Sequence, residues 1–239
     1  MRKVLAVLSL LLVPVMLISA DRDPGTYSIG GFGGIAMPQK PEGFKKYFNS
    51  GIGFGGEFKY NLNPTTSLGL SYTYLSFKAN EDEFKSAFGM MKPFATQITL
   101  EISPTTVSII SANLTKYLTP PEASAGFFLT LGGGYYMAKT EDIKYSYSDP
   151  IWGSGSGTYP TGSEDNDFGI NGGVGLEFKV GEKINLFVVG LYHYVFTSDE
   201  ETNSNTLAKS MADANDQVDM SGKTQVISIM GGLRFSLGQ

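Results

Sequence analysis

The chain has 239 residues, of which 18 are basic and 23 acidic, and it contains no cysteine. This length suits one domain of ordinary size. The lack of cysteine excludes a lipoprotein anchor, a disulfide framework and a thiolate metal site. The acidic balance, without a basic patch, gives no support to nucleic-acid binding.

Residues 1–20 have the layout of a secretory signal peptide. Arg2 and Lys3 precede an apolar run over residues 4–18, and the small residues Ser19 and Ala20 follow it. The alternative is a membrane anchor, but the apolar run has about 15 residues, whereas a spanning helix needs about 20. We therefore predict a signal peptide over 1–20 and one barrel domain over 21–239.

Eight stretches beyond the leader alternate apolar residues with small or polar ones, and such a period of two is typical of strands. In the second stretch, for example, Ile52, Phe54 and Phe58 share one parity. Most stretches have roughly 10 to 14 residues, enough to cross a bilayer on a tilt. In the fourth stretch, Val107 and Ile109 share one parity but Ile110 has the other, so we expect a bulge near Ser111. The predicted strands cover residues 26–36, 51–60, 67–77, 105–117, 125–139, 167–180, 183–197 and 224–237.

The gaps between these stretches alternate in length. Short turns fall at 61–66, 118–124 and 181–182, and long connections fall at 37–50, 78–104, 140–166 and 198–223. This alternation predicts an all-β, eight-stranded antiparallel up-and-down transmembrane β-barrel, with short periplasmic turns and four long extracellular loops. Within the loops we expect a further strand over 96–102, interrupted by Pro104, and short helices over 81–92 and 205–215.

The two faces of the predicted strands differ in chemistry. One parity is rich in glycine, which suits the narrow interior of eight strands, and aromatic residues gather near both strand ends, as in the girdles of membrane barrels. The apolar parity should therefore face lipid. A soluble barrel would instead place that parity inside, including Leu68, Leu70, Leu176 and Phe178.

Charged residues within the strands share the glycine parity. We expect them to form a polar network in a lumen that side chains fill, since pointing them at lipid would cost about 2–4 kcal/mol for each Arg or Lys at mid-depth. The predicted members of this network are Glu57, Lys59, Glu177, Lys179, His193 and Arg234.

The chain resembles the small eight-stranded outer-membrane barrels of Gram-negative bacteria, namely the OmpA-type transmembrane domain and the opacity-protein-like families. The resemblance lies in glycine-rich strands that lead through tight turns to aromatic-rich strands, over 53–77, 127–139 and 169–197. It implies a monomer without cofactor that contacts outer-membrane lipid. The last strand resembles the segment recognised by the barrel-insertion machinery, although Gln239 stands where these families commonly have Phe.

Other candidate chemistry is sparse. His193 is the only histidine, and its neighbours two positions away are Leu191 and Val195, so the sequence positions no nucleophile beside it. The acidic groups at 81–83, 164–167, 199–201 and 213–219 lack the pattern of a calcium loop and suit a solvated surface. Residues 154–157, beside Trp152 and Tyr159, suit a mobile loop tip that contacts an extracellular ligand.

These patterns favour an integral outer-membrane barrel with a structural or adhesin-like surface role and no catalysis. Two alternatives remain. One is an outer-membrane barrel enzyme that acts on lipid or peptide, which requires a Ser or Asp beside His193. The other is a soluble secreted β-barrel that binds a small apolar ligand.

Overall fold

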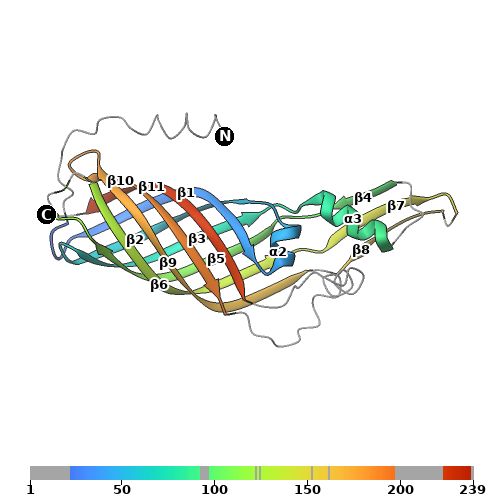
Figure 1. Ribbon diagram of the computed structural model, residues 1–239, viewed down its shortest axis with the longest axis horizontal. Coiled ribbons are helices and arrows are strands. Elements are labelled where there is room, and N and C mark those ends of the chain that lie inside the picture. Colours follow the sequence, from blue (N-terminus) through green and yellow to red (C-terminus); the bar gives the residue numbers. More distant parts are fainter. Residues whose placement is uncertain are drawn as a thin grey trace.

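Eight antiparallel strands close into a barrel in the order β1-β11-β10-β9-β6-β5-β3-β2 (Figure 1). The computed structural model describes residues 22–91, 97–121, 123, 125–151, 153–160, 162–196 and 223–237, with the backbone alone for 87–91. The predicted signal peptide over 1–20, the helix over 205–215 and Gln239 lie outside the described residues. The barrel strands are β1 (Tyr27–Lys40), β2 (Gly51–Asn63), β3 (Thr66–Phe77), β5 (Thr105–Tyr117), β6 (Ala125–Thr140), β9 (Ser163–Lys179), β10 (Ile184–Val195) and β11 (Thr224–Leu237).

The predicted architecture is confirmed, and several strands extend beyond their predicted ends. The apolar parity faces outward: Leu70 is 60% exposed and Leu176 is 42% exposed, whereas Arg234 on the other parity is 3% exposed. Leu68 is also exposed and Phe178 shares the outward parity. This arrangement contradicts the soluble-barrel alternative, which requires these side chains inside.

Aromatic side chains form two outward bands. At the end with the short turns, the ring of Tyr27 lies 5.6 Å from that of Phe58 and 4.9 Å from that of Tyr60. At the other end, Phe54 pairs with Tyr74 at 5.1 Å. In the described strands, no charged side chain points outward between these two bands. The belt between them is therefore an apolar surface without charge.

The interior contains rings as well as glycine. The inward residues Phe32, Phe128 and Phe187 each lie directly opposite a glycine of a neighbouring strand. A Cβ on Gly175, for instance, would lie 2.7 Å from Cε2 of Phe128. Glycine thus leaves the space that inward rings fill. Phe128 and Phe187 belong to a buried apolar cluster. The sequence predicted small residues and charges on this inward face but not these rings.

The expected bulge near Ser111 is wrong. β5 pairs with β3 and with β6 without a register shift, so its parity is regular throughout. Ile109 is buried inside, whereas Ile110 and Leu114 are exposed outside. The ambiguity arises because apolar residues occur on both faces of this strand, and the interior accepts them.

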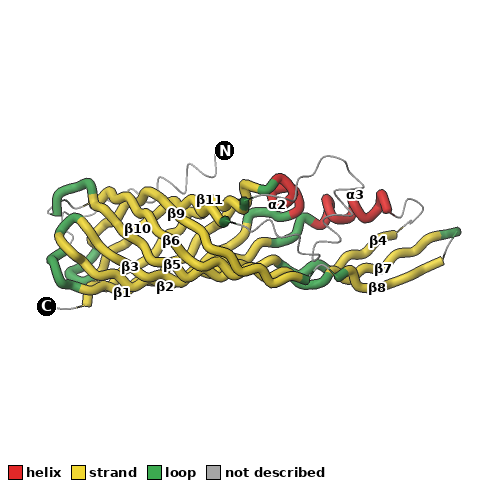
Figure 2. Tube along the Cα trace, turned by 90° about the horizontal axis from the view of Figure 1, so that it is seen from below, coloured by secondary structure: helices red, strands yellow, loops and turns green. Residues whose placement is uncertain are grey.

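The long connections carry structure of their own, in an arm that continues the long direction of the barrel away from the end with the short turns (Figures 1 and 2). It contains helices α2 (Glu42–Tyr47) and α3 (Glu81–Met91) and a sheet in the order β4-β7-β8. These strands are β4 (Gln97–Glu101), β7 (Ile143–Asp149) and β8 (Gly153–Tyr159). No helix in the described residues is long and apolar enough to span a membrane.

The strand expected over 96–102 and the helix expected over 81–92 are confirmed as β4 and α3. The mobile tip expected over 154–157 is wrong, because these residues belong to β8, and Trp152 is outside the described residues. Glycine is depleted in strands, so a Gly-Ser repeat suggests a loop. Here the rings of Tyr147 and Tyr145 in β7 cover Gly155 and Gly157 of β8 and replace their missing side chains.

Gly175→Val should destabilise the barrel, because the new side chain overlaps the Phe128 ring. We expect a loss of about 1–3 kcal/mol, measured from the urea midpoint of unfolding in lipid vesicles. Gly133→Val is the matched control, because Gly133 points outward with only one backbone oxygen near its Cβ direction, at 3.8 Å. Equal midpoints for the two variants would contradict this account of the interior.

Candidate functional site

The centre of the lumen is an ion cluster around Arg234 of β11. Its Nε and Nη2 donate to Oε1 of Glu57 at 2.9 and 2.5 Å, and its Nη1 forms an ion pair with Oε2 of Glu177. Lys59 Nζ lies 3.8 Å from Oε2 of Glu57. Two carboxylates and two cations therefore balance in charge, although they come from three different strands.

Neutral partners complete this ion cluster. The Tyr117 hydroxyl donates to Oε2 of Glu177 at 3.0 Å, and Asn185 Nδ2 donates to Oε1 of Glu177 at 3.3 Å. The Arg234 guanidinium lies 4.6 Å from the centre of the Phe187 ring. Buried charges require this degree of pairing and hydrogen bonding, since an unpaired charge in the same place is costly.

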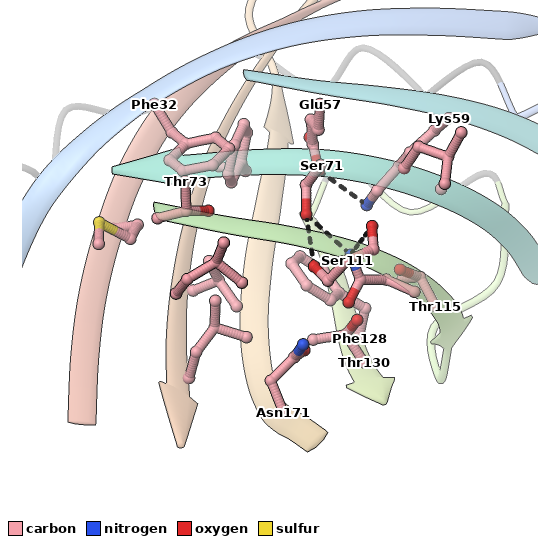
Figure 3. Close-up of a pocket in the computed structure, with 18 of the residues that line it drawn as sticks. Phe32, Glu57, Lys59, Ser71, Thr73, Ser111, Thr115, Phe128, Thr130 and Asn171 are labelled. Carbon is pink, nitrogen blue, oxygen red and sulfur yellow. Dashed lines mark hydrogen bonds and ion pairs between the residues drawn. The ribbon is translucent and has the colours of Figure 1, made fainter. Parts of the chain in front are cut away.

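A cavity of about 60 Å³ lies beside the ion cluster (Figure 3). Ser71 and Ser111 line it, with their hydroxyls 2.9 Å apart, and Asn113 Nδ2 donates to both hydroxyls at 2.9 and 3.1 Å. The volume has room for roughly four water molecules.

His193 lies in a second polar group of the lumen. Its Nδ1 lies 3.1 Å from the Tyr136 hydroxyl and its Nε2 lies 3.0 Å from the Ser228 hydroxyl. The spacing along one strand predicts no nucleophile here, because Ser228 lies on the neighbouring strand β11. It is paired with Leu191, two residues from His193. The histidine–serine pair is buried, with exposures of 4% and 0%.

The sixth predicted member of the network, Lys179, does not reach the ion cluster. It is half-buried near the end of β9, and it makes no ion pair with any described residue. Its partner across the ladder, Asn185, bonds to Glu177 instead. Lys179 thus shares the inward parity but lies close to the mouth of the barrel.

Side chains close both mouths of the lumen. At the end with short turns, the guanidinium of Arg22 lies 4.2 Å from the centre of the Tyr117 ring, and its Nη2 donates to the Pro120 carbonyl at 2.9 Å. At the other end, Phe44 of α2 packs on the buried Phe77, with the ring centres 5.2 Å apart. Side chains thus narrow the lumen at both ends.

The arm has an apolar cluster of its own. Tyr47, Phe84, Leu100 and Ile143 are at most 8% exposed, and they come from α2, α3, β4 and β7. The Tyr47 and Phe84 rings lie 5.0 Å apart. Because three of the long connections contribute to one core, the arm is a packed unit rather than a set of independent loops.

The acidic groups of the arm have structural partners. Residues 81–83 form the first turn of α3, where negative charge favours the helix dipole, and Lys85 pairs with Glu81 at 3.1 Å. Lys139 binds Glu164 at 2.9 Å, and that hydrogen bond and charge raise the pKa of Lys139. The described residues contain no group of three or more His, Asp or Glu side chains that could hold a metal ion. The acidic groups at 199–201 and 213–219 lie outside the described residues.

Several solved structures are similar to this chain at low sequence identity. Neisserial surface protein A is 12% identical over 87% of this chain and 96% of its own, with a TM-score of 0.45. The attachment invasion locus protein of Yersinia pestis is 12% identical over 90% of this chain and 99% of its own, with a TM-score of 0.44. A major outer membrane protein of Thermus thermophilus is 11% identical over 89% and 99%, with a TM-score of 0.48. No protein-family model and no curated protein matches the chain.

The outward side chains of the barrel show that it lies in a membrane. A soluble protein rarely exposes a contiguous apolar patch of more than a few hundred Å², whereas this belt surrounds the whole barrel between two aromatic bands. The chain is an outer-membrane β-barrel. In the orientation general to such barrels, its short turns face the periplasm and the arm projects outside the cell.

Arg234→Met should destabilise the barrel strongly, because it leaves the carboxylates of Glu57 and Glu177 buried without their shared cation. Removing one partner of a buried pair costs about 3–5 kcal/mol. The urea midpoint of unfolding in vesicles measures the loss.

Two comparisons test whether the loss comes from unpaired charge. Lys139→Met breaks an exposed ion pair of the arm and should leave the midpoint unchanged. The fourfold variant Glu57→Gln, Lys59→Met, Glu177→Gln and Arg234→Met removes every charge of the ion cluster and should recover most of the stability. A fourfold variant as unstable as Arg234→Met alone would refute the explanation.

Proposed function

We propose that the protein is a non-enzymatic surface-interaction protein, in which the barrel is the anchor and the arm is the adhesin-like contact region. The observation that carries this proposal is the separate apolar core of the arm. It comprises Tyr47, Phe84, Leu100 and Ile143 and holds three long connections together outside the membrane. A packed platform binds a partner without the entropy cost of ordering loops.

The filled lumen supports a role outside transport. The ion cluster and the rings occupy the barrel, and a cavity of about 60 Å³ beside Asn113 has no room for a solute larger than a few waters. We infer that outer-membrane lipid is the partner of the outward belt, and that the machinery that inserts barrels recognises the last strand. Phe235 and Leu237 of that strand keep the outward parity. Within one membrane the protein should be a monomer.

The histidine–serine pair is the observation that favours the rival enzyme function. Ser228 Oγ within 3.0 Å of His193 Nε2 has the geometry of an activated nucleophile. However, Ser228 is fully buried and faces neither lipid nor water. In addition, the other ring nitrogen of His193 meets the Tyr136 hydroxyl rather than a carboxylate. We infer that the pair is structural.

Replacing residues 141–162 by Asn-Gly should abolish surface binding and leave the barrel folded. Thr140 and Ser163 are directly paired, so a two-residue turn can join them as a hairpin. Fluorescent proteoliposomes would be applied to epithelial monolayers and to plates coated with mucin, laminin or fibronectin. We expect the intact protein to bind at least one surface at ten times the level of the shortened variant.

Migration of unheated samples on gels verifies that the shortened barrel is closed. If the intact protein binds no surface better than empty vesicles, or if the shortened variant binds equally well, the contact role of the arm is wrong.

Catalysis is tested separately with vesicles that contain labelled phospholipid and labelled peptide. We expect the intact protein to release no more product than empty vesicles, because Ser228 cannot meet either substrate. Release by the intact protein that disappears in both Ser228→Ala and His193→Ala would establish the enzyme alternative instead.

A further inference from the structure

Among the described strands of the arm, β8 lies at an edge of the three-stranded sheet. Its neighbour on one side is β7, and within the described part of the chain no strand lies on its other side. Its sequence, GSGSGTY, has no charge and no proline, and it pairs with β7 without a bulge. Natural proteins usually block an edge with one of these features, because its unpaired backbone groups otherwise accept another strand.

The two faces of β8 keep this edge flat. On one face the rings of Tyr147 and Tyr145 lie over Gly155 and Gly157, where a Cβ would come within 2.8 Å of each hydroxyl oxygen. On the other face the short side chains of Ser154, Ser156 and Thr158 are exposed. An incoming strand would therefore meet no bulky side chain of β8.

The sequence of β8 complements itself. If two copies pair antiparallel about Ser156, each Ser154 faces a Thr158, each Gly155 faces a Gly157, and the two Ser156 residues face each other. Hydroxyl pairs across antiparallel strands are favourable. The whole chain has a net charge of −5, so two copies repel each other in general, but this edge is neutral. A second copy of the chain is thus the occupant that the edge fits.

The direction of the arm decides which second copy can pair in this way. β7 and β8 run along the long direction of the molecule, away from the membrane (Figures 1 and 2). Two copies in one membrane are related by rotation about the membrane normal, so their β8 strands point the same way and could pair only in parallel. Copies in two facing membranes point toward each other, and their β8 strands run antiparallel, which is the slightly more stable pairing.

We propose that the β8 edge pairs antiparallel with β8 of a second copy in a facing outer membrane, so that the protein joins cells of its own kind. This proposal rests on the proposed function of the arm and names its partner. One seven-residue strand buries less surface than a stable pair in solution needs, which is above about 1,000 Å². Many copies between two membranes supply the missing affinity through avidity.

Clustering of proteoliposomes, followed by dynamic light scattering, tests the proposal. The intact protein should cluster vesicles steeply with its surface density and remain monomeric in detergent. Ser156→Lys places two like charges opposite each other at the centre of the paired edges, and Ser156→Asp does the same with the other sign. Each variant alone should cluster at least tenfold less. A mixture of Ser156→Lys vesicles with Ser156→Asp vesicles should cluster as the intact protein does.

Thr99→Lys is the matched control, because Thr99 lies on β4 in the same row and on the same face, two strands from the edge. It should cluster normally. The proposal is overturned if the intact protein does not cluster, if Ser156→Lys clusters like the intact protein, or if the mixture fails to recover.

The two proposals can fail separately. If clustering is absent but arm-dependent binding to coated surfaces persists in Ser156→Lys, the contact role of the arm stands and the pairing between copies is wrong. If that binding is lost in Ser156→Lys while the intact protein never clusters, the edge takes a foreign strand and a second copy is the wrong occupant.

Discussion

The structure depends on one constraint: a barrel of eight strands encloses too little space for water to solvate what points inward. Every inward group must therefore find a partner or a space among the other strands. The ion cluster meets this requirement for charge, since Arg234 serves two carboxylates at once. Glycine provides the space that bulky inward rings need, since Phe32, Phe128 and Phe187 each lie opposite a glycine. The outward face faces only lipid and needs no such matching.

The arm is a second packed unit, with an apolar core separate from that of the barrel. Helix α2 links the two regions, because Phe44 packs into the barrel mouth while Tyr47 belongs to the core of the arm. The arm is thereby held against the barrel at its base, and its sheet projects beyond the membrane surface.

Sequence periodicity was sufficient for the barrel and for its inside and outside, because a period of two along one strand fixes which residues share a face. It named Glu57, Lys59, Glu177 and Arg234 for the same reason. It failed where the answer depends on the neighbouring strand. Ser228 contacts His193 from the neighbouring strand. In β8, Gly155 and Gly157 are covered by tyrosines of the neighbouring strand β7. Parity also says nothing of depth, so it could not separate Lys179, near the mouth, from the buried charges.

The ion cluster joins the beginning of the chain to its end, since Glu57 and Arg234 are 177 positions apart. Glu57 lies on β2 and Glu177 on β9, whereas their shared cation lies on the last strand, β11, which pairs with β1 to close the barrel. A sheet without β11 would leave Glu177 with no cation beside it and Glu57 with Lys59 alone. One strand therefore both closes the barrel and supplies the cation that neutralises its buried carboxylates.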